Sequence, residues 1–163
     1  MSFQYLLDTN IFLEANKFHY PMDIFPAFWE WLDHENNIGK IASIMPVYVE
    51  MKDYKDDLSE WIMVRKKQWF LPIHDVDTQE KYIEIANYVE SCGRFERTAV
   101  ADFLDKADSW IIAKALSLHC AVVTHEISDP KCRRRIKIPD ICNKFNVNYT
   151  NTINLLRDRN AKF

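Results

Sequence analysis

The chain has 163 residues, 48% of them hydrophobic and 13% aromatic, a composition that can bury one sizeable core and predicts a single domain over residues 1–163. Its formal net charge of -3 argues against a protein that coats nucleic acid by bulk attraction. Only Gly39 and Gly93 are glycines, which excludes the glycine-rich phosphate loops of nucleotide-dependent enzymes. No signal peptide and no apolar run of about 20 residues is found, so we expect a cytoplasmic protein without a membrane anchor.

Short apolar strands alternate with amphipathic helices along the chain. The strands are predicted at residues 5–7, 40–44, 69–73, 121–126 and 146–150. The helices are predicted from Thr9 or Asn10, at 25–37, 47–54 and 56–67, from a capping box at Asp77 and Glu80 to Gly93, at 98–104 and 107–119, from Pro139, and at 152–160. This alternation is typical of a parallel sheet covered by helices on both faces.

Four acidic residues are predicted to meet at one edge of that sheet. Asp8 ends the first strand and Glu126 ends the strand 121–126, and ligands of open parallel sheets bind outside the carboxyl ends of the strands. Glu50 lies early on the helix after the second strand. Asp108 lies in the first turn of the helix 107–119, whose apolar periodicity turns it toward the core.

Four neighbouring carboxylates repel one another unless a cation compensates their charge. Mg²⁺ and Mn²⁺ prefer oxygen ligands, so Asp8 is predicted to be a metal ligand. Taken singly, each acid has an ordinary structural explanation: a helix cap, an exposed helix position or a favourable place at the helix dipole. A zinc site at His125 and Cys132 is disfavoured because no second pair of such ligands completes it.

Several motifs, in order, resemble those of the PIN-domain nucleases of the toxin type. They are DTN after an apolar strand, the acid Glu50, A-D-x-x-I-x-A-x-A-L at Ala107–Leu116, and V-V-T-x-E at Val122–Glu126. The resemblance extends from Tyr5 to about Thr152. The segment KIPDIC resembles a prokaryotic branch of PIN-like proteins.

The resemblance implies a three-layer α/β/α sandwich with a central, mainly parallel sheet and an acidic cluster that binds Mg²⁺ or Mn²⁺. It assigns the catalytic and metal-binding positions to Asp8, Glu50, Asp108 and Glu126, with Asp140 as a fifth metal ligand and Asp129 as its competitor. Asn10 falls on the position that orients the first acid by hydrogen bonding, and Thr124 on the hydroxyl position before the last acid. Glu126 departs from the family pattern, which usually has Asp there.

The implied activity is hydrolysis of RNA phosphodiester bonds, with the protein acting as the toxin of a toxin–antitoxin pair. Basic residues that could hold the RNA backbone follow the last acid, at Arg133, Arg134, Arg135 and Lys137. A second basic group, 65–67, precedes Trp69 and Phe70.

The implied partners are an RNA substrate, an antitoxin protein and a second copy of the chain, with the aromatic stretch 25–32 as a candidate partner or dimer surface. The alternative is a catalytically silent PIN-like module that binds RNA or protein. The Asp-to-Glu change at Glu126 is the sequence feature that favours it.

Overall fold

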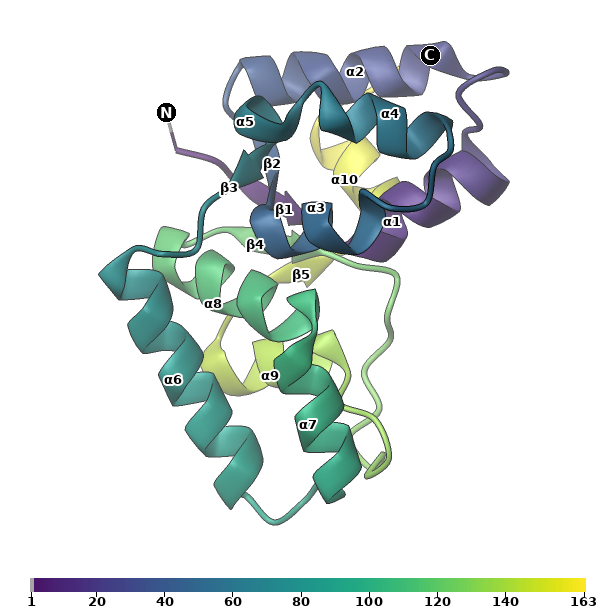
Figure 1. Ribbon diagram of the computed structural model, residues 1–163. Helices are drawn as coiled ribbons and strands as arrows, with labels where there is room; N and C mark the ends of the chain where they lie inside the picture. Colours follow the sequence, from purple (N-terminus) through teal and green to yellow (C-terminus); the bar gives the residue numbers. More distant parts are fainter. Residues whose placement is uncertain (1) are drawn as a thin grey trace.

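The structure is a computed structural model that describes residues 2–163, and a five-stranded sheet lies at its centre (Figure 1). The strands are β1 (Tyr5–Leu7), β2 (Ile41–Ile44), β3 (Phe70–Leu71), β4 (Ala121–Val123) and β5 (Tyr149–Thr150). Their order is β3-β2-β1-β4-β5 and all four pairings are parallel. The predicted parallel sheet is confirmed.

The position of β1 decides where a ligand can bind. Leu6 pairs in register with Ala42 of β2 and with Val122 of β4, so the carboxyl ends of these three strands lie side by side. From β1 the chain adds strands first on one side, as β2 and β3, and then on the other, as β4 and β5. The reversal between β1 and β4 is a topological switch point, where open parallel sheets leave a crevice.

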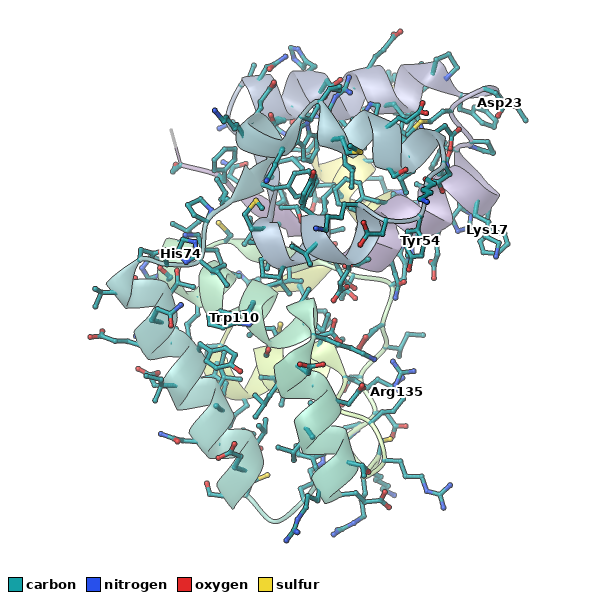
Figure 2. The ribbon with its side chains drawn as sticks, in the orientation of Figure 1. Lys17, Asp23, Tyr54, His74, Trp110 and Arg135 are labelled. Atoms are coloured by element: carbon teal, nitrogen blue, oxygen red, sulfur yellow. The ribbon has the colours of Figure 1, made fainter. Side chains whose placement is uncertain are left out.

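Helices cover both faces of the sheet, as predicted for an α/β/α sandwich. They are α1 (Thr9–Glu14), the π-helix η1 (Ala15–His19), α2 (Pro26–Asn37), α3 (Met45–Met51), α4 (Asp57–Met63), α5 (Lys66–Trp69), α6 (Val76–Ser91), α7 (Arg97–Asp105), α8 (Ala107–Leu118), α9 (Ile138–Phe145) and α10 (Thr152–Asp158). On one face α8 packs on β1, β2 and β4, and α6, α7 and α9 pack against α8; α2 covers β2 from the other face (Figure 1). Trp110 of α8 stacks on Tyr82 of α6 with ring centroids 3.8 Å apart (Figure 2).

The predicted start of the helix that ends at Gly93 is wrong, and the helix predicted at 47–54 is α3, Met45–Met51. The capping residue of α6 is Asp75, whose carboxylate accepts hydrogen bonds from the backbone N and the hydroxyl of Thr78, at 3.0 and 2.7 Å. Asp77 therefore lies inside the first turn and forms no capping box. The capping box of this structure is at Asp56 and Ser59, which open α4.

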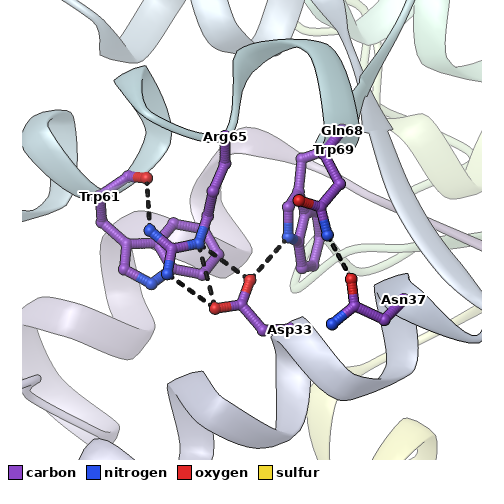
Figure 3. Close-up of polar contacts among 6 residues, drawn as sticks. All are labelled: Asp33, Asn37, Trp61, Arg65, Gln68 and Trp69. Atoms are coloured by element: carbon purple, nitrogen blue, oxygen red, sulfur yellow. Dashed lines mark hydrogen bonds and ion pairs between the residues drawn. The ribbon is translucent and has the colours of Figure 1, made fainter.

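The predicted helix 56–67 is divided into α4 and α5 at Arg65, and Figure 3 shows the contacts at the break. The Arg65 guanidinium donates to both carboxylate oxygens of Asp33 on α2, at 2.7 to 3.0 Å, and Trp69 Nε1 donates to Asp33 Oδ1 at 3.0 Å. Trp69 is 0% exposed. Arg65 is thus engaged by Asp33 and Trp69 lies in the core, so neither side chain is presented as a free contact for RNA.

The aromatic stretch 25–32 mostly serves the core. Phe28, Trp29 and Leu32 lie on the buried face of α2. Phe25, which directly precedes the helix, is exposed. The apolar periodicity of an amphipathic helix explains this, since the buried residues share one face. The stretch therefore offers little apolar surface to a partner. Over residues 2–163, no helix combines the length and hydrophobicity needed to cross a membrane.

Candidate active site

The four predicted acids line one cleft of about 460 Å³ at the switch point of the sheet. Asp8 directly follows β1 and caps α1, and Glu50 projects from α3. Asp108 lies in the first turn of α8, and Glu126 comes three residues after β4, which ends at Val123. The strand 121–126 is thus shorter than predicted, because the chain leaves the sheet at Thr124 and carries Glu126 into the cleft.

Asp8 is the most buried of the four acids, with 2% of its surface exposed. Its backbone N donates to the carbonyl of Val123 at 3.0 Å, which extends the sheet ladder to the site. Its Oδ1 accepts from the backbone N of Thr9 at 2.8 Å and its Oδ2 from the hydroxyl of Thr124 at 3.2 Å. These contacts fix the carboxylate in one orientation.

Burial, together with the negative charges of Asp108 and Glu126, raises the pKa of Asp8 to about 8. The hydrogen bonds from Thr9 and Thr124 oppose this shift. Burial also raises the pKa of Asp108 to about 7, together with the charges of Glu126 and then Glu50. A cation in the cleft would favour the ionised form of both groups.

Glu50 links two helices at the cleft. Its Oε1 accepts from the hydroxyl of Thr9 at 2.7 Å, and its Oε2 accepts from the backbone N of Ala107 at 2.9 Å, the first residue of α8. Thr9 therefore holds Asp8 through its backbone and Glu50 through its side chain. This role of Thr9 was not predicted, and its only signal in the sequence is a hydroxyl residue directly after the first acid.

Thr124 joins the two acids that follow the strands. Its hydroxyl donates to Asp8 Oδ2 and accepts from the backbone N of Glu126 at 3.1 Å. The Glu126 side chain in turn accepts from the backbone N of Ile138 at 3.0 Å, at the first residue of α9. The longer side chain of Glu thus reaches a helix N-terminus, where a negative charge is favourable.

Asn10 lines the cleft, but within the described chain the hydrogen bonds to the Asp8 carboxylate come from Thr9 and Thr124. The first helical turn explains the difference: Asn10 lies one residue farther along α1, and its side chain is exposed. The orienting role predicted for Asn10 thus falls on its neighbour.

Asp140, predicted as a fifth metal ligand, is buried and is not among the residues that line the cleft. Its two oxygens accept from the hydroxyl of Ser128 at 2.6 Å and from the backbone N of Asp129 at 3.1 Å, and Arg94 Nη2 lies 3.7 Å away. Asp140 therefore ties down the loop between β4 and α9. Its competitor Asp129 is exposed and contributes its backbone to the same contact.

Of the predicted basic residues, Arg135 reaches the cleft (Figure 2). Arg134 is exposed with its Nε 4.0 Å from Glu96, and Arg133 extends toward the carbonyl of Gly93. Lys137 is the residue that precedes α9. Lys106 also lines the cleft, and the sequence analysis did not single it out although it directly precedes the third acid motif.

The chemistry of the donors fits a hard divalent cation, because all four are carboxylates and burial penalises the charge of two of them. In the arrangement seen over residues 2–163, no three His, Cys, Asp or Glu side chains are grouped so that they could hold an ion. Magnesium commonly uses one or two protein carboxylates and keeps several waters. Two carboxylates of the cleft would be enough for a site of that kind.

The fold is similar to that of several solved structures. VapBC2 from Rickettsia felis, crystallised with a DNA fragment from the promoter, is 17% identical, with a TM-score of 0.57 over 90% of this chain and 97% of that one. FitAcB from Neisseria gonorrhoeae is also 17% identical, with a TM-score of 0.52 over 91% and 97% of the two chains. These likenesses confirm the PIN-like α/β/α fold that the motifs implied.

Among curated protein sequences, none matches this chain. A family model described as "Domain of unknown function (DUF4411)" matches residues 5–163. That range includes all five strands and the four acids of the cleft. The chain belongs to the DUF4411 family.

Proposed function

We propose that this protein is a metal-dependent endoribonuclease, with Mg²⁺ or Mn²⁺ as its ion, and that it serves as the toxin of a toxin–antitoxin pair. The observation that carries the proposal is the convergence of Asp8, Glu50, Asp108 and Glu126, from four separate segments, on one cleft at the switch point. Burial and mutual repulsion raise the pKa of Asp8 and Asp108, a cost that a cation in the cleft would relieve.

The residues of the cleft would have different roles in hydrolysis. A divalent ion, when bound at these carboxylates, would supply Lewis-acid chemistry for the scissile phosphoryl group and for the attacking water. Asp8 and Asp108 would hold the ion, since they are the acids whose charge the fold compensates least. Thr124 and Thr9 keep Asp8 in place. Arg135 and Lys106 would attract the phosphate backbone to the cleft.

The toxin role is supported by the resemblance of the motifs to toxin-type PIN nucleases and agrees with the likeness of the fold to VapBC2. An antitoxin protein is then the expected partner. Co-purification of this chain with the product of an adjacent gene, together with rescue of growth by that product, tests the role. Growth that is unaffected by expression of the chain alone contradicts it.

The proposed ribonuclease activity is tested by incubating the protein with single-stranded and structured RNAs in Mg²⁺ or Mn²⁺. We expect the wild type to cleave RNA, EDTA to stop the reaction, and Asp8→Asn and Asp108→Asn to lower the rate by at least ~100-fold while circular dichroism stays unchanged. Asp23→Asn, an exposed acid outside the cleft, is the matched control and should cleave normally. Cleavage that persists in both cleft variants would refute the assignment of the site.

The second candidate is a silent PIN-like module that only binds RNA or protein. It is favoured by Glu126, which stands where the PIN-domain nucleases usually have Asp. The Glu126 carboxylate also accepts a hydrogen bond from the backbone N of Ile138. For this candidate, a folded wild type binds Mn²⁺ and RNA but cleaves no substrate. A Glu126→Asp variant that gains cleavage would then show that the longer side chain silences the site.

A further inference from the structure

A second hollow adjoins the acidic cleft. Its volume is about 540 Å³, and it lies between the end of α1, the π-helix η1 and the connection from α3 to α4. Leu13 and Tyr54 line both the hollow and the cleft, so the two form one continuous depression. A polymer held at the acids would therefore place its next unit in this hollow.

Two aromatic rings in the hollow are exposed. The side chains of Tyr54 and Phe18 are 57% and 65% exposed, and in Figure 2 Tyr54 lies close to Lys17, another residue of the lining. Lys17 Nζ lies 5.2 Å from the centroid of the Phe18 ring. Exposed rings beside a strand-binding cleft are what unstacked bases use as a platform in proteins that hold single-stranded nucleic acid.

The polar groups of the hollow suit a base better than a phosphate. Asp56 and Glu14 give the lining two acids against the single cation Lys17, which disfavours a phosphate group there. Asp56 Oδ1 accepts from the backbone N of Ser59, while its Oδ2 accepts no hydrogen bond from residues 2–163. A carboxylate oxygen can only accept, so it matches an amino group on the edge of a base.

We propose that this hollow binds the base of a nucleotide that flanks the cleaved bond, with Tyr54 stacking on the ring and Asp56 Oδ2 accepting from its exocyclic amino group. The inference rests on the proposed ribonuclease function, because Arg135 and Lys106 at the acidic cleft would hold the phosphate next to this base. Cytosine carries an amino donor at position 4 where uracil carries a carbonyl acceptor. The subsite should therefore prefer cytosine to uracil.

The test measures binding without cleavage. Fluorescein-labelled rC6 and rU6 are titrated with the protein in EDTA and followed by fluorescence anisotropy. We expect rC6 to bind more tightly than rU6, Tyr54→Ala to weaken rC6 about tenfold, and Tyr54→Phe to bind as the wild type does. Tyr149→Ala removes a partly exposed tyrosine that lies outside both hollows and should change nothing.

Asp56→Asn tests the base preference directly. Asparagine keeps the cap of α4, because its side-chain oxygen can still accept from Ser59 N, but its amide nitrogen turns the free acceptor into a donor. The variant should then bind rU6 more tightly than rC6, a reversal that damage to the fold would not produce.

The result that overturns the proposal is equal binding of rC6 and rU6 by the wild type, with no effect of Tyr54→Ala. It is also overturned if Tyr54→Ala weakens a labelled arginine-rich peptide and leaves both RNAs unaffected, since the hollow is then a protein interface. Failure of the ribonuclease function shows separately, as absence of cleavage with metal ions while the preference for rC6 in EDTA persists.

Discussion

The Asp8→Asn variant should fold more stably than the wild type when no metal ion is present. The pKa of Asp8 rises from 3.8 in the unfolded chain to about 8 in the fold, chiefly through burial. A group whose pKa is raised on folding stabilises the fold fully below its unfolded value, and this contribution is lost as the pH rises through the folded value. From 3.8 to pH 7 is about 3 units, which at about 1.4 kcal/mol per unit gives a cost of up to ~4 kcal/mol at neutral pH.

Asparagine removes this cost and keeps the local contacts. Its oxygen can accept from Thr9 N in place of Asp8 Oδ1, and its amide nitrogen can donate to the Thr124 hydroxyl that now donates to Oδ2. The gain in stability should therefore be close to zero at pH 4, where the wild-type carboxyl is largely protonated in the fold. At pH 8 the gain in stability should be about 1–4 kcal/mol. It stays below the full cost because Asp8 and Asp108 titrate as a coupled pair and part of the repulsion between them belongs to Asp108.

Urea unfolding in EDTA, followed by tryptophan fluorescence at pH 4 and pH 8, measures the difference. Adding Mn²⁺ at pH 8 should stabilise the wild type more than the variant, because the variant has lost a charged ligand. A variant that is less stable than the wild type at pH 8, or a gain of equal size at both pH values, would refute the reasoning that the Asp8 charge is uncompensated in the metal-free fold.

Three further predictions follow from named contacts. Lys114→Met should lower the free energy of unfolding by about 0.5–1.5 kcal/mol at pH 7, a modest effect because Asp75 is partly exposed and solvent screens the pair. The effect should be smaller at pH 3, because the Lys114 ammonium holds the pKa of the Asp75 carboxyl below its usual range and this stabilisation is lost on acidification. Urea midpoints at the two pH values check it. Thr124→Val should reduce cleavage by about 10- to 100-fold with the RNA affinity unchanged, as separate rate and anisotropy measurements would show. Arg65→Met should lower the free energy of unfolding by about 1–3 kcal/mol, because Asp33 loses its cation. The cleavage rate should stay at the wild-type level, and a fall in that rate would indicate that Arg65 contacts RNA.

The layout of the fold could be predicted because its signals are local. Apolar strands that alternate with amphipathic helices specify a parallel sheet, and the carboxyl ends of parallel strands must share one edge. Asp8 and Glu126 could therefore be brought together from the sequence although 118 positions separate them. Asp108 followed because it lies in the first turn of α8, which starts at the same edge. Glu50 was expected early on its helix, but α3 spans Met45–Met51 and places it in the last turn.

The contacts that depend on exact register could not be predicted in this way. A shift of one residue moves the orienting role from Asn10 to Thr9, and a shift of two moves the cap of α6 from Asp77 to Asp75. The division between α4 and α5 at Arg65 depends on Asp33, 32 positions earlier, so no local sequence pattern predicts it. Such pairings are set by packing between helices, which composition and periodicity do not determine.

The four predicted acids of the cleft are not equivalent, and the difference indicates where an ion would bind. Glu50 and Glu126 accept hydrogen bonds from the first backbone N–H groups of α8 and α9, so the fold itself supports their negative charge. Asp8 and Asp108 are the pair whose pKa values are raised, and the charge of Glu126 contributes to both shifts. A divalent ion gains most by neutralising the charges that the fold supports least. Asp8 and Asp108 would therefore be the residues that hold the ion, and the two glutamates, already engaged at helix N-termini, would contribute less to holding it. Glu in place of Asp at position 126 would then be compatible with catalysis.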